Sequence, residues 1–154
     1  MNIRNMNINE LLENILKRLR PIADQRRIDL ILDSFRPVTA DVDEVKFTLA
    51  ISNLVENGIK YNVDEGWVRV TLDADHKDFY VTVADSGLGI PEDSIERIFE
   101  RFYRVDKSHS REIGGTGLGL AIVKHIVARN GARMELTSEV GKGTEIRIYF
   151  DKAA

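Results

Sequence analysis

Three glycines alternate with other residues just before an apolar segment of helical period, in GGTGLGLAIVKHIVARNG (residues 114–131). The first turn of a helix leaves backbone N–H groups unpaired and carries a partial positive charge. Because glycine has no side chain, an anion can approach those donors closely at Gly115, Gly117 and Gly119. The segment therefore points to phosphate binding, while a flexible surface loop that ends at a helix is an equally compatible interpretation.

A second group of polar residues, Asn53, Asn57 and Lys60, shares one face of a helix expected over 43–61. Asn57 lies at the border of the apolar stripe of this helix, and its amide oxygen is a ligand of the kind that Mg²⁺ prefers. Lys60, one turn further, can meet a phosphate as a point charge. Taken alone, this face is better explained as a solvated surface with a Glu56–Lys60 ion pair.

The apolar stripe of the same helix contains a glycine. Phe47, Ile51, Leu54, Gly58 and Tyr61 follow at spacings of four, three, four and three residues, which predicts a core face. A glycine inside a helix costs about 1 kcal/mol relative to alanine. Gly58 therefore indicates a close approach to the helix at this point.

The sequence ADSGLGIP (residues 84–91) ends an apolar strand with a carboxylate and continues with two glycines. Asp85 is expected at the edge of the core, where it can accept hydrogen bonds from an exocyclic amine. Gly87 and Gly89 allow a flat ring to lie against the backbone. By itself, Asp-Ser-Gly is also a common turn.

The segment IFERFYR (residues 98–104) combines three aromatic side chains with two arginines. Phe99 and Phe102 are spaced as core residues of a helix, and either arginine can complement polyphosphate charge. The polar stretch that follows, 103–116, has little periodicity and is expected to form a mobile lid.

Hydrophobic periodicity predicts the elements that must position these residues. Helices are expected over 9–26, 43–61, 92–102 and 118–130, and strands over 28–34, 37–42, 67–74, 78–85, 132–140 and 143–150. Pro21 is expected to kink or interrupt the first helix, and Asp43 to cap the second. The last four strands are expected to form two hairpins. This order predicts an α/β sandwich in which helices cover one face of a single mixed sheet.

Composition narrows the function classes. Of the 154 residues, 43% are hydrophobic and 31% are charged, so the chain can bury one core as a single domain. Cysteine is absent, which excludes disulfides, thiolate metal sites and thiol nucleophiles. The net charge of −3 disfavours broad nucleic-acid binding. No apolar run is long enough to span a membrane, and the first residues lack a signal-peptide pattern.

The order of these motifs is more specific than any one of them. An Asn-x-x-x-Asn-x-x-Lys-Tyr helix precedes a strand ending in Asp-x-Gly-x-Gly-Ile, a Phe/Arg segment, Gly-x-Gly-x-Gly-Leu before a helix, and a closing Gly-x-Gly-Thr. Over roughly residues 6–150 the chain resembles the catalytic ATP-binding domain of sensor histidine kinases. The resemblance implies the α+β, two-layer Bergerat ATP-binding fold, with ATP and Mg²⁺ as ligands, and the P-loop pattern is absent.

The resemblance also implies a role for each motif residue. Asn57 would bind Mg²⁺, and Asn57, Lys60 and Arg104 would be the catalytic residues at the transferring phosphate. The other nucleotide contacts that it implies are Asn53, Tyr61, Asp85, Gly87, Gly89, Ile90, Phe102, Gly115, Thr116, Gly117, Leu118, Gly119, Leu120 and Thr144. Asp85 would bind the adenine amino group, and the N-terminus of the helix over 118–130 would hold the phosphates.

Two positions bear on the reaction that the resemblance implies. Related ATPases carry a water-activating glutamate four residues before the metal-binding asparagine, where this chain has Asn53, which cannot act as a base. Hydrolysis is therefore expected to be poor. None of His76, His109 and His125 has the setting of the family's phospho-accepting histidine. We therefore expect residues 1–154 to be the catalytic domain alone, without the dimerisation and phosphoacceptor domain.

The expected activity is transfer of the γ-phosphoryl group of ATP to a histidine on a helical dimerisation domain, with a response regulator downstream. Neither nucleic acid nor direct membrane contact is expected, and the domain is expected in the cytoplasm. Two alternatives stay open: a regulatory nucleotide-binding module of the same fold, and a serine-directed kinase of the anti-sigma type. The Lys60-Tyr61 pair and the full Phe/Arg segment disfavour the serine-directed kinase.

Overall fold

The computed structural model of the chain describes residues 2–95, 119–129 and 132–151. Their elements are, in order, β1 (Ile3–Asn7), α1 (Ile8–Gln25), β2 (Asp29–Ser34), β3 (Thr39–Asp43), α2 (Glu44–Lys60), β4 (Trp67–Ala74), β5 (Asp78–Asp85), the 3-10 turn η1 (Glu92–Ser94), α4 (Gly119–Arg129), β6 (Arg133–Glu139) and β7 (Gly143–Asp151). Both predicted hairpins are confirmed, and the last two strands turn at Gly141–Gly143 as expected.

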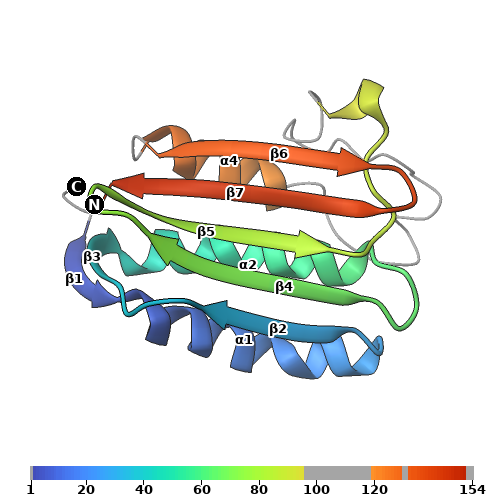
Figure 1. Cartoon of the computed structure of the whole chain (residues 1–154), viewed down its shortest axis with the longest axis horizontal. Coiled ribbons are helices and arrows are strands. Elements are labelled where there is room, and N and C mark those ends of the chain that lie inside the picture. The colour runs from blue at the N-terminus through green and yellow to red at the C-terminus, as the bar shows by residue number, and fades with distance from the viewer. Residues whose placement is uncertain (1, 96–118, 130–131, 152–154) are drawn as a thin grey trace.

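Five strands form the main sheet in the order β2-β4-β5-β7-β6. β2 and β4 run parallel, whereas the other neighbouring pairs are antiparallel, so the sheet is mixed. Figure 1 shows α1, α2 and α4 behind this sheet, all on the same face. The predicted two-layer sandwich, with helices on one face of a mixed sheet, is therefore confirmed.

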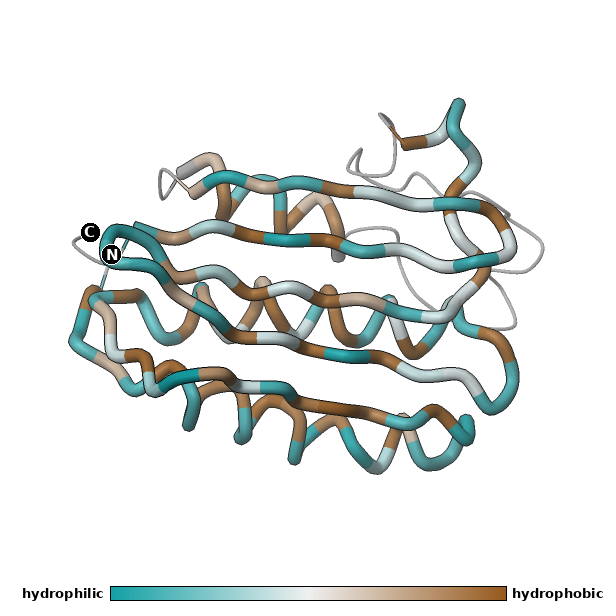
Figure 2. Tube along the Cα trace, in the orientation of Figure 1, coloured by the Kyte–Doolittle hydropathy of each residue, from teal (hydrophilic) through white to brown (hydrophobic). Residues whose placement is uncertain are grey.

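The core lies between the sheet and the helices. On β4 the side chains of Val68, Val70 and Leu72 are fully buried, while the residues between them are exposed or half-buried. Burying one such side chain contributes roughly 1.5–3 kcal/mol, so this alternation fixes which face of the strand meets the helices. Figure 2 shows the same alternation of hydropathy along the central strands.

The first helix packs an apolar stripe on this sheet. Leu12, Ile15, Leu16 and Leu19 are at most 2% exposed, as their helical spacing predicts. The predicted interruption at Pro21 is wrong, because α1 continues through this residue to Gln25. Pro21 is exposed, so its ring points away from the core and only one helical N–H donor is missing.

One part of the predicted sheet was placed wrongly. The segment expected as a strand over 37–42 appears as β3, but it does not join the main sheet. β3 pairs antiparallel with β1, from Ile3 opposite Asp43 to Asn7 opposite Thr39. β1 could not be recognised from the sequence, because only Met6 among its five residues is partly buried and its apolar residues do not alternate.

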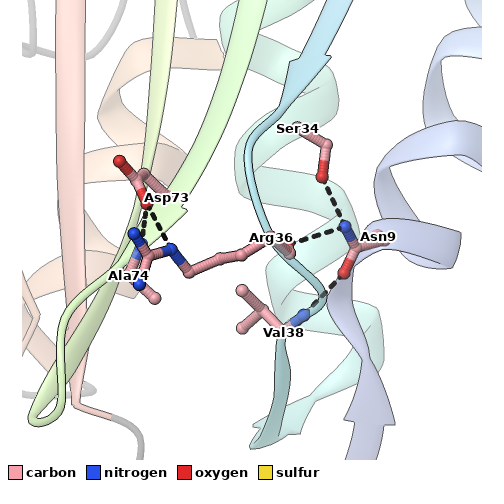
Figure 3. A network of polar contacts seen from close by, with 6 residues as sticks. All are labelled: Asn9, Ser34, Arg36, Val38, Asp73 and Ala74. Atoms are coloured by element: carbon pink, nitrogen blue, oxygen red, sulfur yellow. Dashed lines mark hydrogen bonds and ion pairs between the residues drawn. The ribbon is translucent and has the colours of Figure 1, made fainter.

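Asn9 fastens this small sheet to the rest of the domain (Figure 3). Its amide nitrogen donates to the Ser34 hydroxyl and, over 3.2 Å, to the Arg36 carbonyl, while its amide oxygen accepts the Val38 N–H at 2.8 Å. Arg36 also forms an ion pair with Asp73 of β4, at 2.9 Å. One asparagine at the start of α1 therefore holds the β2–β3 connection in place.

We expect Asp43→Ala to destabilise the fold by about 1 kcal/mol, because Asp43 is the N-cap of α2 and accepts the Lys46 N–H at 3.1 Å. Backbone hydrogen bonds from Lys46 and Asn2 lower the pKa of its carboxyl. A lowered folded-state pKa gives stability that is present above the ordinary carboxyl pKa and is lost as the pH falls through the lowered one. Urea unfolding at neutral and acidic pH measures this loss, with the exposed Asp64→Ala as control.

Candidate functional site

The C-terminal half of α2 carries two asparagines whose amide oxygens accept no hydrogen bond from any described residue. The side-chain nitrogen of Asn53 donates to the Leu49 carbonyl, and that of Asn57 donates to the Asn53 carbonyl, both over 2.9 Å. A carbonyl oxygen can only accept a hydrogen bond, so the nitrogen of each amide is assigned without ambiguity. Each amide oxygen therefore points away from the helix backbone, and both side chains are half-buried.

Gly58 is a point at which α2 closely approaches the sheet. A methyl group added there would lie 3.2 Å from a methyl carbon of Val68 on β4 and 3.5 Å from Oδ2 of Asp85 on β5. The close approach predicted at Gly58 is therefore confirmed, and the neighbouring residues belong to the sheet. Because Asn57 precedes Gly58, the turn of α2 that faces the Asp85 carboxylate also carries an amide oxygen that no described residue bonds.

Register places four side chains in one row at the end of the sheet. Asp85 lies opposite Val68 on one side and opposite Thr144 on the other, and Thr144 lies opposite Ser138. The alternation of buried residues along these strands directs all four toward the helix layer. In Figure 1 this row lies at the right-hand end, where α2 also ends, opposite the end at which β7 finishes.

The two oxygens of the Asp85 carboxylate have different surroundings. Oδ1 accepts the Gly87 N–H at 2.8 Å and the Thr144 N–H at 3.3 Å. No described residue donates a hydrogen bond to Oδ2, which faces Gly58. Burial raises the pKa of this carboxyl to about 6, against the opposing effect of the two N–H groups. Asp85 is thus a partly desolvated carboxylate with one oxygen open to a donor.

The loop after Asp85 is held between the end of α2 and the β6–β7 turn. Leu88 donates its N–H to the Tyr61 carbonyl at 3.0 Å, and its own carbonyl accepts the Gly141 N–H at 3.0 Å. A side chain at Gly87 would meet the Tyr61 carbonyl oxygen at 2.5 Å. Gly89 has a φ of 76° and packs on the Glu139 carbonyl. This close packing fixes the floor of the site with backbone atoms.

The structure brings together many of the residues that the sequence singled out. Asn53, Asn57 and Lys60 share a stripe on α2, and Tyr61 caps its C-terminus. Asp85, Gly87, Gly89, Ile90 and Thr144 meet at the end of the sheet. Gly119 begins α4, in which Leu120 is half-buried, and α4 packs beside α2. The described residues form no Glu56–Lys60 ion pair.

Some predictions fall outside the described residues. These are Phe99, Phe102, Arg104, His109, Gly115, Thr116, Gly117, Leu118 and the lid expected over 103–116. Of the helix predicted over 92–102, the structure describes η1 only.

Comparison with known proteins agrees with this geometry. Residues 42–154 match the family described as histidine kinase-, DNA gyrase B- and HSP90-like ATPases. The chain belongs to this ATPase family. It is 39% identical, over 95% of its length, to the phosphate regulon sensor protein PhoR of Pseudomonas aeruginosa. The resemblance to the catalytic ATP-binding domain of sensor histidine kinases is therefore confirmed.

Solved structures of this ATPase family share the fold. The mycobacterial sensor histidine kinase MprB superposes with a TM-score of 0.83 at 26% identity, covering 99% of each chain. Full-length ShkA in complex with AMPPNP gives a TM-score of 0.86 at 28% identity, covering 100% of this chain and 32% of that one. The chain spans only 33% of the length of PhoR, so it corresponds to one part of that relative.

Sequence reasoning missed two polar residues that hold the candidate site together. Asn62 donates to the carbonyls of Gly58 and Trp67, at 3.0 and 2.9 Å, and its oxygen accepts from the Ser86 hydroxyl. The Ser86 hydroxyl in turn accepts the Trp67 N–H at 2.8 Å. Together they tie the end of α2 to the start of β4 and to the residue after Asp85. The available signal was an asparagine directly after the helix C-cap, where side-chain bonding to the backbone is common.

Neither a membrane-spanning helix nor a protein-built metal cluster is found among the described residues. None of the described helices is long and apolar enough to cross a membrane. The described His, Asp and Glu side chains do not gather in a group of three that could hold a metal ion.

Two glycines of the β6–β7 turn provide a test of the site's packing. Gly141 and Gly143 both have positive φ, at 82° and 121°, but a side chain at Gly141 would meet nothing within 4 Å. At Gly143 it would lie 2.0 Å from the Asp85 carbonyl oxygen. We expect Gly141→Ala to cost about 1 kcal/mol, and Gly143→Ala at least twice that, because it adds a clash to backbone strain. Urea unfolding of both variants measures the difference, and equal costs would contradict the packing argument.

Proposed function

We propose that this domain binds ATP together with Mg²⁺ and donates the γ-phosphoryl group to a histidine on a helical dimerisation and phosphoacceptor domain. The observation that carries the proposal is Oδ2 of Asp85, which accepts no hydrogen bond from a described residue and faces Gly58 of α2, the residue after Asn57. Oδ2 is a hydrogen-bond acceptor beside closely packed backbone, which suits the amino group of adenine. The polar stripe of α2 leads away from it and suits a triphosphate.

The adenine end of the site uses residues fixed by the sheet. Asp85 accepts the exocyclic amine through Oδ2, because Oδ1 is already occupied by two N–H groups. Gly87 and Gly89 let the loop pack against the Tyr61 and Glu139 carbonyls beside the flat ring. Ile90 contacts the ring, and Tyr61 and Thr144 line the pocket. Since Oδ2 is partly desolvated, its hydrogen bond to the amine is stronger than it would be in water.

The phosphate end uses α2 and the segment before α4. Asn57 holds Mg²⁺ through its amide oxygen, supported by Asn53, and Lys60 meets the phosphates. When bound, Mg²⁺ neutralises phosphate charge. We further propose that Arg104 and Phe102, with the segment from Gly115 through Thr116, Gly117 and Leu118 to Gly119 and Leu120, complete the site around the phosphates. Transfer forms a P–N bond to the acceptor histidine, and ADP leaves with the bridging oxygen.

The same proposal covers the other domains and partners with which this domain would work. Residues 1–154 form one catalytic domain, and the acceptor histidine belongs to a dimerisation domain outside it. A response regulator receives the phosphoryl group afterwards. The domain works in the cytoplasm, as part of a sensor kinase of the kind that the name of the Pseudomonas relative describes.

Two measurements on the purified chain test the proposal. Calorimetric titration of ATP with and without Mg²⁺ is expected to give binding that the metal strengthens. Adding a dimerisation domain and ATP labelled on its γ-phosphate should then give an acid-labile phosphohistidine. Binding without transfer would favour a regulatory module, and transfer to serine would favour a serine-directed kinase. No heat with millimolar ATP would contradict the nucleotide site itself.

A further inference from the structure

Ser138 lies next to the proposed adenine pocket but has no place in the motifs that identify it. Its hydroxyl oxygen accepts the Ile90 N–H at 2.8 Å and lies 2.8 Å from the Thr144 hydroxyl oxygen and 3.1 Å from the Gly143 carbonyl. Ser138 therefore joins three backbone segments: the end of β6, the start of β7 and the loop after Asp85. Two of these segments contact that carboxylate, because Gly87 in the loop and Thr144 at the start of β7 donate their N–H groups to Oδ1.

The single proton of the Ser138 hydroxyl links its contacts to Thr144. With the Ile90 N–H bonded to its oxygen, Ser138 can donate either to the Gly143 carbonyl or to the Thr144 hydroxyl. In the second arrangement the Thr144 proton is released from this network and can be donated into the pocket. Thr144 is half-buried in the row that faces the helices, next to Asp85. Without Ser138, nothing else in the described residues bonds to the Thr144 hydroxyl.

The orientation of the Thr144 hydroxyl determines which purine base fits the pocket. Adenine presents an amine, which donates, beside a ring nitrogen, which accepts. The pair formed by the Asp85 carboxylate and a donating Thr144 hydroxyl is complementary to that edge. Guanine presents a carbonyl oxygen and a ring N–H instead, so each of its groups would meet one of the same kind.

We infer that Ser138 is a positioning residue for base recognition: it holds the Thr144 hydroxyl in the orientation that donates into the pocket, so that the pocket selects adenine over guanine. The inference rests on the proposed nucleotide site. Ser138 itself acts through its neighbours, because its oxygen is already bonded to Ile90, Gly143 and Thr144.

Ser138→Ala and Thr137→Ala are matched variants for the test. Both remove one hydroxyl from β6, but Thr137 is exposed on the opposite face of the strand. Calorimetry with Mg²⁺·ATP and Mg²⁺·GTP is expected to give about tenfold weaker ATP binding for Ser138→Ala, with a reduced ratio of ATP to GTP affinity. Thr137→Ala should bind like the wild type. Unfolding measured without nucleotide shows whether each variant is folded.

A double-mutant cycle separates positioning from a general loss of stability. If Ser138 acts through Thr144, adding Ser138→Ala to Thr144→Val should change the ATP to GTP affinity ratio by less than about twofold. A tenfold further change would overturn the inference. Should Ser138→Ala fail to fold, Ser138→Thr carries the test, because it keeps the hydroxyl and should retain the wild-type preference for ATP.

The outcomes distinguish this inference from the proposed function beneath it. ATP affinity and base preference of Ser138→Ala within twofold of Thr137→Ala would overturn the role of Ser138 and leave the nucleotide site standing. Loss of the ATP preference in a folded Ser138→Thr variant would do the same. Absence of ATP binding by the wild type would instead remove the site on which the inference rests.

Discussion

We expect Asp85→Asn to make the nucleotide-free protein more stable near neutral pH, although it removes a central residue of the proposed site. Burial raises the pKa of Asp85 to about 6, so the folded state disfavours the ionised carboxylate. Stability from a raised pKa is fully present below the unfolded-state pKa and is lost as the pH rises through the folded-state value. The wild type should therefore lose stability between about pH 4 and pH 6 through this group.

Asparagine cannot ionise, so the variant should lack this part of the pH dependence. Its amide oxygen can still accept the Gly87 and Thr144 N–H groups, but its NH₂ group would face Gly58 in place of Oδ2. Burying that donor offsets part of the gain, which leaves a net stabilisation of about 1 kcal/mol at neutral pH. Urea unfolding at several pH values measures this, with Asp78→Asn at the other end of β5 as the matched control.

The same substitution should weaken ATP binding by about 100-fold, because an NH₂ group would meet the adenine amine where an acceptor is needed. GTP presents a carbonyl oxygen at that place, so the preference for ATP over GTP should disappear. Calorimetry with both nucleotides measures the two affinities. A variant that keeps its preference for ATP would remove Asp85 from the adenine site. Stability and function would thus pull in opposite directions at this residue.

Most of the main sheet could be predicted because its faces have different surroundings. β4 and β5 each place one face on the core, so their apolar residues alternate and the hairpin can be recognised from sequence. The boundary of α2 was equally predictable, since Asp43 caps it through a local hydrogen bond. β1 has no such pattern, because its partner is the short β3 and neither face is buried like those of the main sheet.

Some residues of the candidate site can also be recognised from the sequence, whereas others cannot. Asn57 and Asp85 could be selected as candidates from the sequence, because their side-chain types suit metal and amine binding and because they border apolar stripes. Ser138 could not, since its role depends on lying opposite Thr144 and within reach of Ile90, 48 residues away in sequence. Register across three strands decides those contacts, and no local pattern around Ser138 reports it.

Asn57→Ala should nearly abolish the contribution of Mg²⁺ to nucleotide binding. The amide NH₂ of Asn57 is used by the Asn53 carbonyl, which leaves its oxygen as the part able to bind the metal. Removing a ligand from an ion that takes few protein ligands should weaken Mg²⁺·ATP binding by about 100-fold. ATP binding without Mg²⁺ should change by less than about threefold. Alanine favours the helix more than asparagine does, so the loss cannot be attributed to unfolding of α2.

Asn57→Asp distinguishes orientation from ligand type, because it keeps an oxygen but loses the donor that holds the side chain in place. Its carboxylate would face the Asn53 carbonyl, an acceptor against an acceptor, and would turn away from its present position. We therefore expect Asn57→Asp to be impaired as well. Glu56→Ala is the control, since Glu56 neighbours Asn57 but lines the groove between α1 and α2. Calorimetry with and without Mg²⁺ measures these affinities. If Asn57→Ala binds Mg²⁺·ATP within twofold of Glu56→Ala, the metal is held by other residues and the assignment of Asn57 at the phosphate end of the site is wrong.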